Sequence, residues 1–491
     1  MAAAEEEEQT LFGICLPTPE DKILKKIISK LTVKEKAAPG RPKHFGLKIC
    51  RCVIKDKGYV CVPKAQYQLL IDMKLLDDYV IKYPVVRKID NIMIEEKDFF
   101  DYQIAAVNHV NQLYETQNHA YLEMETGLGK TRTGCGIIAT VGEPTLVVCP
   151  TDAIATQWID EFGQVFTDKT ISMYKNTMKN PPTPETHDVI VIIINTLRKK
   201  PPGFFSGFGL VIFDEAHEYQ SDKSRHIFWY CQHTRMLGLS ASPNERKDGL
   251  DFIVNMFLGN PINKHDIENF DTSSVNFTVN VNIVNYVGHD NHVETIIGPT
   301  GTMSAIMTIG NIIKDPYRNK LIANEIYKYL TMKLPEGKKH GIFVFAEHRE
   351  YLTIIRDELL KLYKDATVLI PELEEVNTNI SVLKGGVAKD AVDIAKKEKA
   401  HVVLTTYGFS RRGISLPDMT CLILATPRRN GLNQVVGRIL RRNSDQTIVR
   451  QVVDIVDTCT GLKPQVSERT KLYKDRGYKI SKTNVIWEDL Q

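Results

Sequence analysis

Cysteine, long apolar runs and an excess of charge of either sign are all scarce in this sequence of 491 residues. The nine cysteines are scattered, and the one close pair, Cys50 and Cys52, lacks zinc-finger spacing. We therefore expect reduced thiols and an intracellular protein. The longest apolar run, residues 189–194, has the length of a strand, so we expect no membrane partner. Because the net charge is only +3, a nucleic-acid surface would have to be a local patch.

We also expect no secretory signal, because residues 1–9 carry four successive glutamates instead of a basic flank and an apolar stretch. Residues 1–90 predict a small α+β module. Its evidence is two short β-like stretches around Lys57-Gly58, followed by a helical pattern over residues 67–76. No repeat of solenoid period occurs.

Two later blocks alternate apolar runs with amphipathic segments, which is typical of α/β domains with parallel sheets. The first block covers residues 91–260 and the second covers residues 315–458. Between them, residues 261–314 are rich in Asn, Asp and Gly and are interpreted as a linker or a β-rich insertion. Residues 459–491 are interpreted as a Lys- and Tyr-rich tail on the surface.

A glycine-containing loop supplies the strongest local signal, Thr126-Gly127-Leu128-Gly129-Lys130-Thr131. It follows an expected strand and precedes an expected helix, where backbone N–H groups can face phosphates. In this arrangement Lys130 would reach the β- and γ-phosphates, and the Thr131 hydroxyl would ligate Mg²⁺. Met124 stands where the strict pattern has glycine, so an ordinary strand-to-helix turn is the alternative interpretation.

A second signal is the apolar strand that ends in Asp214-Glu215-Ala216-His217. Ligands bind at the carboxyl ends of strands in such sheets, so Asp214 would hold Mg²⁺ and Glu215 would deprotonate the attacking water. A third signal, Gln434 to Arg441, places Arg438 and Arg441 three residues apart, on one face of an expected helix. Both could supply positive charge to the phosphates; the alternative is a solvated basic face.

From Phe99 to Asp457, the order of these motifs resembles that of superfamily 2 helicases. The resemblance implies an α/β fold with two tandem RecA-like, doubly wound parallel-sheet domains after the small α+β module. It also implies ATP and Mg²⁺ as cofactors, with hydrolysis of ATP to ADP and phosphate. Three departures from the family pattern are Met124, Ser242 and Ser415.

The resemblance assigns roles to residues in each motif. The catalytic group is Lys130, Asp214, Glu215, Gln434, Arg438 and Arg441. ATP binding is assigned to Tyr102, Gln103 and the loop Thr126 to Thr131, with Gln103 bonded to the base. Coupling between ATP and nucleic acid is assigned to His217, Ser240, Ser242 and Gly413. Contacts to the nucleic-acid backbone are assigned to Thr151, Arg198, Thr406 and Arg412, each of which could instead be a structural polar residue.

Within the superfamily, Leu239 to Pro243 and the segment Tyr407 to Ile414 look more like the XPB and UvsW group of DNA translocases. Residues 195–201 and 425–430 are similar to the asfarvirus and poxvirus transcript-release helicases of large cytoplasmic DNA viruses. The resemblance implies a DNA motor that acts in viral transcription with the viral RNA polymerase, in the virion and the host cytoplasm. Its partner would be duplex, forked or single-stranded DNA, with RNA or a DNA–RNA hybrid as the alternative.

Two other functions stay open at this point. The chain could be a non-hydrolysing docking subunit, although an inactive site has no need of its full set of catalytic residues. It could also be an RNA remodeller, and stimulation by RNA above matched DNA would distinguish that activity. Trp158, Cys135 and Cys149 are expected to be core residues.

Overall fold

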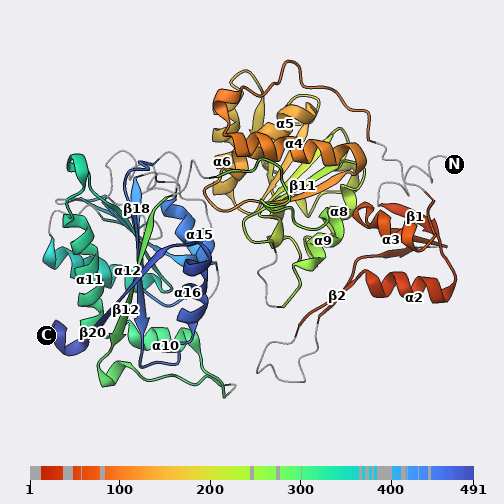
Figure 1. The fold of residues 1–491 in the computed structure, drawn as a ribbon. Coiled ribbons are helices and arrows are strands. Elements are labelled where there is room, and N and C mark those ends of the chain that lie inside the picture. Colours follow the sequence, from red (N-terminus) through yellow and green to blue (C-terminus); the bar gives the residue numbers. More distant parts are fainter. Residues whose placement is uncertain are drawn as a thin grey trace. The chain divides into compact units, whose positions relative to one another are not determined.

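In the computed structural model the chain forms two compact units, Met1–Thr272 and Ser273–Gln491 (Figure 1). The structure describes residues 13–36, 48–56, 58–77, 83–243, 248–272, 277–299, 301–363, 368–370, 375–378, 381–383, 401–410, 416, 418–428, 431–440 and 444–491. None of the described helices is both long enough and apolar enough to cross a membrane.

The chain begins with the small α+β module that the sequence predicts. Its three-stranded antiparallel sheet has the order β1-β5-β4, from Ile14–Pro17, Tyr59–Val62 and Ile54–Asp56. The turn between β4 and β5 contains Gly58 with φ +88°, a left-handed conformation that glycine tolerates. The module also contains α2 (Asp21–Lys30), α3 (Tyr67–Asp72) and the strand pair β2 (Thr32–Lys34) and β3 (Ile49–Arg51).

This module shares a hydrophobic core with the α/β domain that follows. Ile27 and Leu70 of the module are fully buried in one cluster with Phe228 and Phe257. The Lys64 backbone N–H also donates to Gln232 Oε1 over 2.7 Å. The prediction of reduced thiols fails at one place, because Cys15 and Cys61 face each other across β1 and β5 and form a disulfide.

A six-stranded sheet, parallel throughout, follows in the first unit, in the order β6-β11-β10-β7-β9-β8. Its strands are His119–Glu123 (β6), Thr145–Cys149 (β7), Ile171–Met173 (β8), Val189–Ile193 (β9), Leu210–Asp214 (β10) and Arg235–Ser240 (β11). All but β8 fall on apolar runs within the predicted α/β block of residues 91–260, as expected for strands buried on both faces. Its longest helices are α4 (Asp101–Thr116), α5 (Lys130–Val141) and α6 (Asp152–Val165), with short helices α7 (Ile194–Leu197), α8 (His226–Tyr230) and α9 (Phe252–Leu258).

The second unit contains a nine-stranded sheet in the order β16-β15-β14-β17-β13-β18-β19-β12-β20. Its strands are Val279–Val287 (β12), Gly341–Ala346 (β13), Val368–Ile370 (β14), Glu375–Thr378 (β15), Ser381–Leu383 (β16), Val402–Thr406 (β17), Met419–Leu424 (β18), Arg450–Asp457 (β19) and Lys479–Ile486 (β20). Among the strand pairs that the structure describes here, β14–β15 and β15–β16 are antiparallel and the others are parallel. Figure 1 shows α11 (Pro316–Thr331) and α12 (Arg349–Leu362) on one face, and α15 (Leu432–Val436) and α16 (Gln465–Asp475) on the other.

Two segments differ in part from their sequence interpretation. The segment predicted as a linker or a β-rich insertion, residues 261–314, does contain a strand, β12, but β12 pairs along its whole length with β19 and β20 and so belongs to the sheet of the second unit. It also contains α10 (Ala305–Ile312). The segment predicted as a surface tail, residues 459–491, supplies α16 and the edge strand β20, whose continuous polar run over residues 481–484 hid its strand character.

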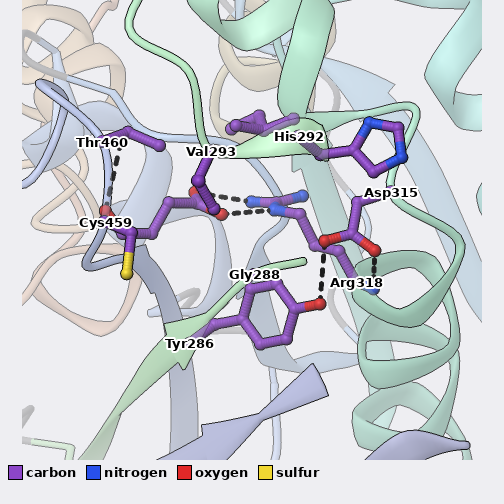
Figure 2. A pocket seen from close by; sticks show the side chains of 10 residues that line it. Tyr286, Gly288, His292, Val293, Asp315, Arg318, Cys459 and Thr460 are labelled. Atoms are coloured by element: carbon purple, nitrogen blue, oxygen red, sulfur yellow. Dashed lines mark hydrogen bonds and ion pairs between the residues drawn. The ribbon is translucent and has the colours of Figure 1, made fainter. Parts of the chain in front are cut away.

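A buried ion pair fixes β12, α11 and β19 together (Figure 2). The fully buried Arg318 donates from Nε to Asp457 Oδ1 over 2.6 Å and from Nη2 to Asp457 Oδ2 over 3.0 Å. Its Nη1 also donates to the Tyr351 hydroxyl over 2.7 Å. Asp315 caps α11 and accepts a hydrogen bond from the Tyr286 hydroxyl of β12 over 2.9 Å. Buried charges are tolerated when they are paired in this way.

Candidate functional site

The glycine-containing loop lies between β6 and α5 in the first unit. Gly127 and Gly129 have φ of +96° and +74°, so both positions require the left-handed backbone that glycine adopts easily. Gly129 is the residue before α5, and the free N–H groups of the first turn of that helix form an anion site. Met124, at the position of a missing glycine, is buried and donates its backbone N–H to the Ser240 carbonyl over 2.9 Å. The departure from the strict pattern therefore falls on a core residue at the end of β6.

Two carboxylates follow β10 at the same edge of the sheet. Asp214 is buried and accepts a hydrogen bond from the Trp158 indole N–H at Oδ2 over 2.8 Å. Glu215 has φ +50°, which is uncommon for a residue other than glycine and typical of strained functional turns. The Lys130 ammonium lies 3.7 Å from Glu215 Oε1. The structure thus brings Lys130, Asp214 and Glu215 together, as the sequence predicted.

The charge state of Asp214 is set by its surroundings. Burial, together with the nearby Glu215 carboxylate, raises the pKa of Asp214 from 3.8 to about 6. The Lys130 ammonium and the Trp158 hydrogen bond act in the opposite direction and lower that pKa. A cation at this point would be attracted to two carboxylates that are held close together in a low dielectric.

The carboxylate pair is connected to the end of β11 through His217 and Ser240. His217 Nδ1 lies 2.8 Å from Ser240 Oγ and 3.5 Å from Glu215 Oε2. Ser240 Oγ also accepts the Ser242 backbone N–H over 3.0 Å, and its carbonyl accepts the Met124 N–H. Three of the predicted coupling residues, His217, Ser240 and Ser242, are therefore joined by hydrogen bonds, and His217 lies beside the Glu215 carboxylate.

The site has polar atoms that suit a nucleotide and a divalent cation. Thr126 Oγ1 and Glu215 Oε2 are buried and have no hydrogen-bond partner within the described part of the chain. Such atoms are unfavourable unless a ligand or water satisfies them. The Thr131 hydroxyl, which accepts a hydrogen bond from Gln157 Nε2 over 3.4 Å, and the Asp214 carboxylate are oxygen donors of the kind that Mg²⁺ takes together with phosphates and waters.

Tyr102 and Gln103 brace the loop from α4. Gln103 is fully buried; its Oε1 accepts the Phe100 backbone N–H over 3.0 Å. Its Nε2 donates to the carbonyls of Leu128 and Gly129 over 3.2 and 3.3 Å, and the Tyr102 hydroxyl donates to Leu128 over 3.2 Å. The contacts of Gln103 are therefore with the loop itself, and its bonding to a base stays a prediction.

Sequence reasoning missed the role of two residues on α6. Trp158 is buried, as expected, yet it is also the hydrogen-bond donor to Asp214. Gln157 donates to Thr131. Gly134 of α5 makes room for the Trp158 ring, because a Cβ on Gly134 would lie 2.4 Å from that ring. The proximity of α6 to the loop could be expected from the parallel sheet, whereas the hydrogen bonds could not.

The remaining candidates are more scattered. Thr151 caps α6, its Oγ1 accepting the Ile154 N–H over 3.4 Å, and the half-buried Arg198 ends α7. Thr406 is the last residue of β17. Arg412, Gly413 and Arg441 lie outside the described residues.

Gln434 lies in α15 and Arg438 in the 3₁₀ helix η8 (Gly437–Ile439) of the second unit. The sequence predicted one helix that presents Arg438 and Arg441 on a single face. The α-helix instead ends at Val436, and η8 ends at Ile439, before Arg441 is reached.

A phosphate loop, an acidic pair at a strand end and two parallel-sheet units define a nucleotide-hydrolysing protein of the helicase class. The family described as "Type III restriction enzyme, res subunit" matches residues 96–245. The "Putative ATP-dependent RNA helicase QP509L" of African swine fever virus is 36% identical over 472 residues, which cover 94% of this chain and 89% of that protein. The chain therefore belongs to the family of superfamily 2 helicases of large DNA viruses.

Two further relatives are more distant. The "ATP-dependent DNA helicase uvsW" of Enterobacteria phage T4 is 25% identical over 341 residues, or 68% of this chain and 63% of that protein. A solved fragment of an HsdR subunit of a type I restriction enzyme from Vibrio vulnificus has 17% identity and a TM-score of 0.52, covering 79% of this chain and 68% of that one. The solved structure supports the fold alone, two RecA-like domains in tandem.

Proposed function

We propose that this helicase is a motor that uses ATP hydrolysis to move along DNA. The observation that carries the proposal is the linked group in the first unit. Lys130 lies 3.7 Å from Glu215, and His217 connects Glu215 to Ser240 at the end of the neighbouring strand. A site that only bound ATP would not need a general base, Glu215, that is connected through His217 to Ser240 at the end of a second strand.

Each residue of the site has a chemical task in this proposal. Lys130 and the N–H groups of the first turn of α5 bind the phosphates. Thr131 and Asp214 hold Mg²⁺, which supplies positive charge to the phosphate oxygens. Glu215 orients the attacking water and accepts its proton. Gln434, Arg438 and Arg441 are proposed to complete the catalytic group from the second unit, where the arginines neutralise charge that develops in the transition state.

Movement follows from a difference in affinity between the ATP-bound and ADP-bound states. The phosphate lost on hydrolysis is sensed by Glu215 and His217, and Ser240 and Ser242 transmit the change. Gly413 is proposed to take part in the same coupling. Thr151, Arg198, Thr406 and Arg412 are proposed to contact the nucleic-acid backbone, which gives affinity without sequence choice.

DNA is supported as the partner by the similarity to a phage DNA helicase and by the XPB- and UvsW-like motifs. The finer proposal is a role in viral transcription, in transcript release or DNA remodelling, with the viral RNA polymerase as a partner, in the virion and the host cytoplasm. RNA is the second candidate, because the African swine fever virus relative at 36% identity is described as an RNA helicase.

The test is the steady-state ATPase rate at fixed low salt with no nucleic acid, single-stranded DNA, duplex DNA and matched RNA. Strong stimulation by DNA over RNA is expected. Equal or greater stimulation by RNA would replace the DNA motor with the RNA helicase. The Lys130→Ala variant serves as the control, since its rate should stay at background with every nucleic acid.

A further inference from the structure

The segment that follows the first sheet runs along the candidate ATP site. Ile262 pairs in parallel with Leu122 of β6, the strand at the edge of the first sheet. The Glu123 N–H donates to the Ile262 carbonyl over 2.8 Å, and the Ile262 N–H donates to the Tyr121 carbonyl over 2.7 Å. Residues 261–272, which precede the second unit in the chain, are therefore attached to the strand that leads into the phosphate loop.

Further contacts keep this segment beside the loop. The Lys264 ammonium lies 3.7 Å from Glu125 Oε1, at the start of the loop. Further along the segment, the Phe270 ring packs edge-on against Tyr102, with centroids 5.3 Å apart and planes at 64°. Tyr102 also stacks with Phe100, with ring centroids 5.8 Å apart. Three rings, those of Phe270, Tyr102 and Phe100, therefore lie together beside the loop.

The three rings differ in their exposure. Tyr102 is buried and its hydroxyl is bonded to the Leu128 carbonyl, so it supports the loop. Phe100 is 38% exposed and Phe270 is partly exposed, so ring surface of both remains accessible. The carboxamide of the neighbouring Gln103 is already bonded to the loop. Two of the accessible groups on this side of the phosphate loop, the rings of Phe100 and Phe270, are thus flat and apolar, which suits a purine ring.

We propose that Phe270 forms one wall of the nucleobase site for ATP, opposite or beside Phe100, so that the segment joining the two units is part of the nucleotide site. The inference rests on the proposed ATPase function. Its mechanical consequence is that occupancy of the base site by a nucleotide immobilises residues 261–272. An empty site leaves that segment held by Ile262 and Lys264.

The test measures ligand affinity by displacement of a fluorescent ADP analogue, which does not depend on turnover. Base stacking on an aromatic residue contributes about 1–3 kcal/mol by alanine substitution, and each 1.4 kcal/mol is a factor of ten. Phe270→Ala should therefore weaken ADP binding by about five- to a hundredfold. Pyrophosphate, which lacks a base, should bind Phe270→Ala as it binds wild type. Phe270→Trp, which keeps a flat ring, should bind ADP much as wild type does.

Phe252→Ala is the matched control, because Phe252 is an exposed phenylalanine on α9. It should bind both ligands normally. Equal loss of ADP and pyrophosphate binding in Phe270→Ala would mean that the ring only supports the loop, and would overturn the proposal. Unchanged ADP binding would overturn it as well. A wild-type protein that binds ADP but never hydrolyses ATP would instead refute the proposed function. The effect of Phe270→Ala on ADP binding would still test the nucleobase site, because that assay does not depend on turnover.

Discussion

The hydrogen bond from Trp158 to Asp214 gives the sharpest prediction about the site. Trp158→Phe keeps an aromatic ring in the pocket beside Gly134 and removes only the indole N–H that reaches Asp214 Oδ2 over 2.8 Å. A hydrogen bond to a charged group contributes about 1.5–3 kcal/mol, because the unsatisfied acceptor stays buried when the donor is lost. With 1.4 kcal/mol per factor of ten, the Mg²⁺ concentration for half-maximal ATPase activity should rise by about ten- to a hundredfold.

The same change should alter the pH dependence of the reaction. The Trp158 hydrogen bond lowers the pKa of Asp214, which burial and Glu215 raise to about 6. Without the donor, that pKa rises further, so the carboxylate is protonated at a higher pH. The acid limb of the ATPase profile at limiting Mg²⁺ should therefore move to higher pH.

The assay is ATPase rate against Mg²⁺ concentration at several pH values. Trp229→Phe, the same substitution in the core shared with the N-terminal module, is the matched control and should keep the wild-type profile. Gly134→Ala should reproduce the Trp158→Phe defect, because its methyl group pushes on the indole. The reasoning is refuted if Trp158→Phe has the Mg²⁺ and pH dependence of Trp229→Phe.

Three other variants test separate parts of the account. Glu215→Gln should bind ATP and nucleic acid as wild type does while turnover falls by at least about a hundredfold; a filter-binding assay that shows lost ATP binding would assign Glu215 to the metal instead. Asp214→Asn should raise the free energy of unfolding at pH 7 by about 1–3 kcal/mol, measured without nucleotide and Mg²⁺. The reason is that the raised pKa of Asp214 makes the wild-type protein lose stability as the pH rises from about 4 to about 6, whereas asparagine does not ionise. Equal denaturation midpoints at pH 7 would contradict this. Arg318→Met should lose about 3–5 kcal/mol of stability because Asp457 is left buried without its cation, and an added Asp457→Leu should restore part of it in thermal melts; the ion pair is unimportant if neither melt moves.

Much of the fold could be predicted because its strands are short apolar runs between turn signals. Strands such as β7 and β10 are buried on both faces, and such strands show no polar residue that would interrupt the pattern. The edge strand β20 is mostly exposed and carries four consecutive polar residues at 481–484, so its sequence resembles a surface tail. For β12, the alternation of Asn with apolar residues indicates β structure. The Asn residues, which are half-buried, give no sign that the strand lies inside the sheet of the second unit, so the segment is interpreted from its sequence as a linker or a β-rich insertion.

The catalytic residues were predictable because each sits at a fixed place in a local motif. Lys130 follows the left-handed Gly129, and Asp214 and Glu215 end a buried strand. Contacts between distant segments were not predictable in this way. Trp158 and Phe270 reach the site through the packing of α6 and of residues 261–272, and no spacing in the sequence encodes either contact. The Cys15–Cys61 disulfide also depends on strand register, which a scattered set of cysteines does not indicate.

The most direct test of the central claim is movement itself. A DNA strand that carries biotin at one end is loaded with streptavidin, and its release is followed with the wild-type protein, ATP and Mg²⁺ in the presence of free biotin. The account predicts release that needs hydrolysable ATP, exceeds that from a matched RNA strand, and is absent with Glu215→Gln. Release that persists with Glu215→Gln, or ATP hydrolysis by wild type without any release from DNA, would contradict the claim that this helicase is an ATP-driven motor on DNA.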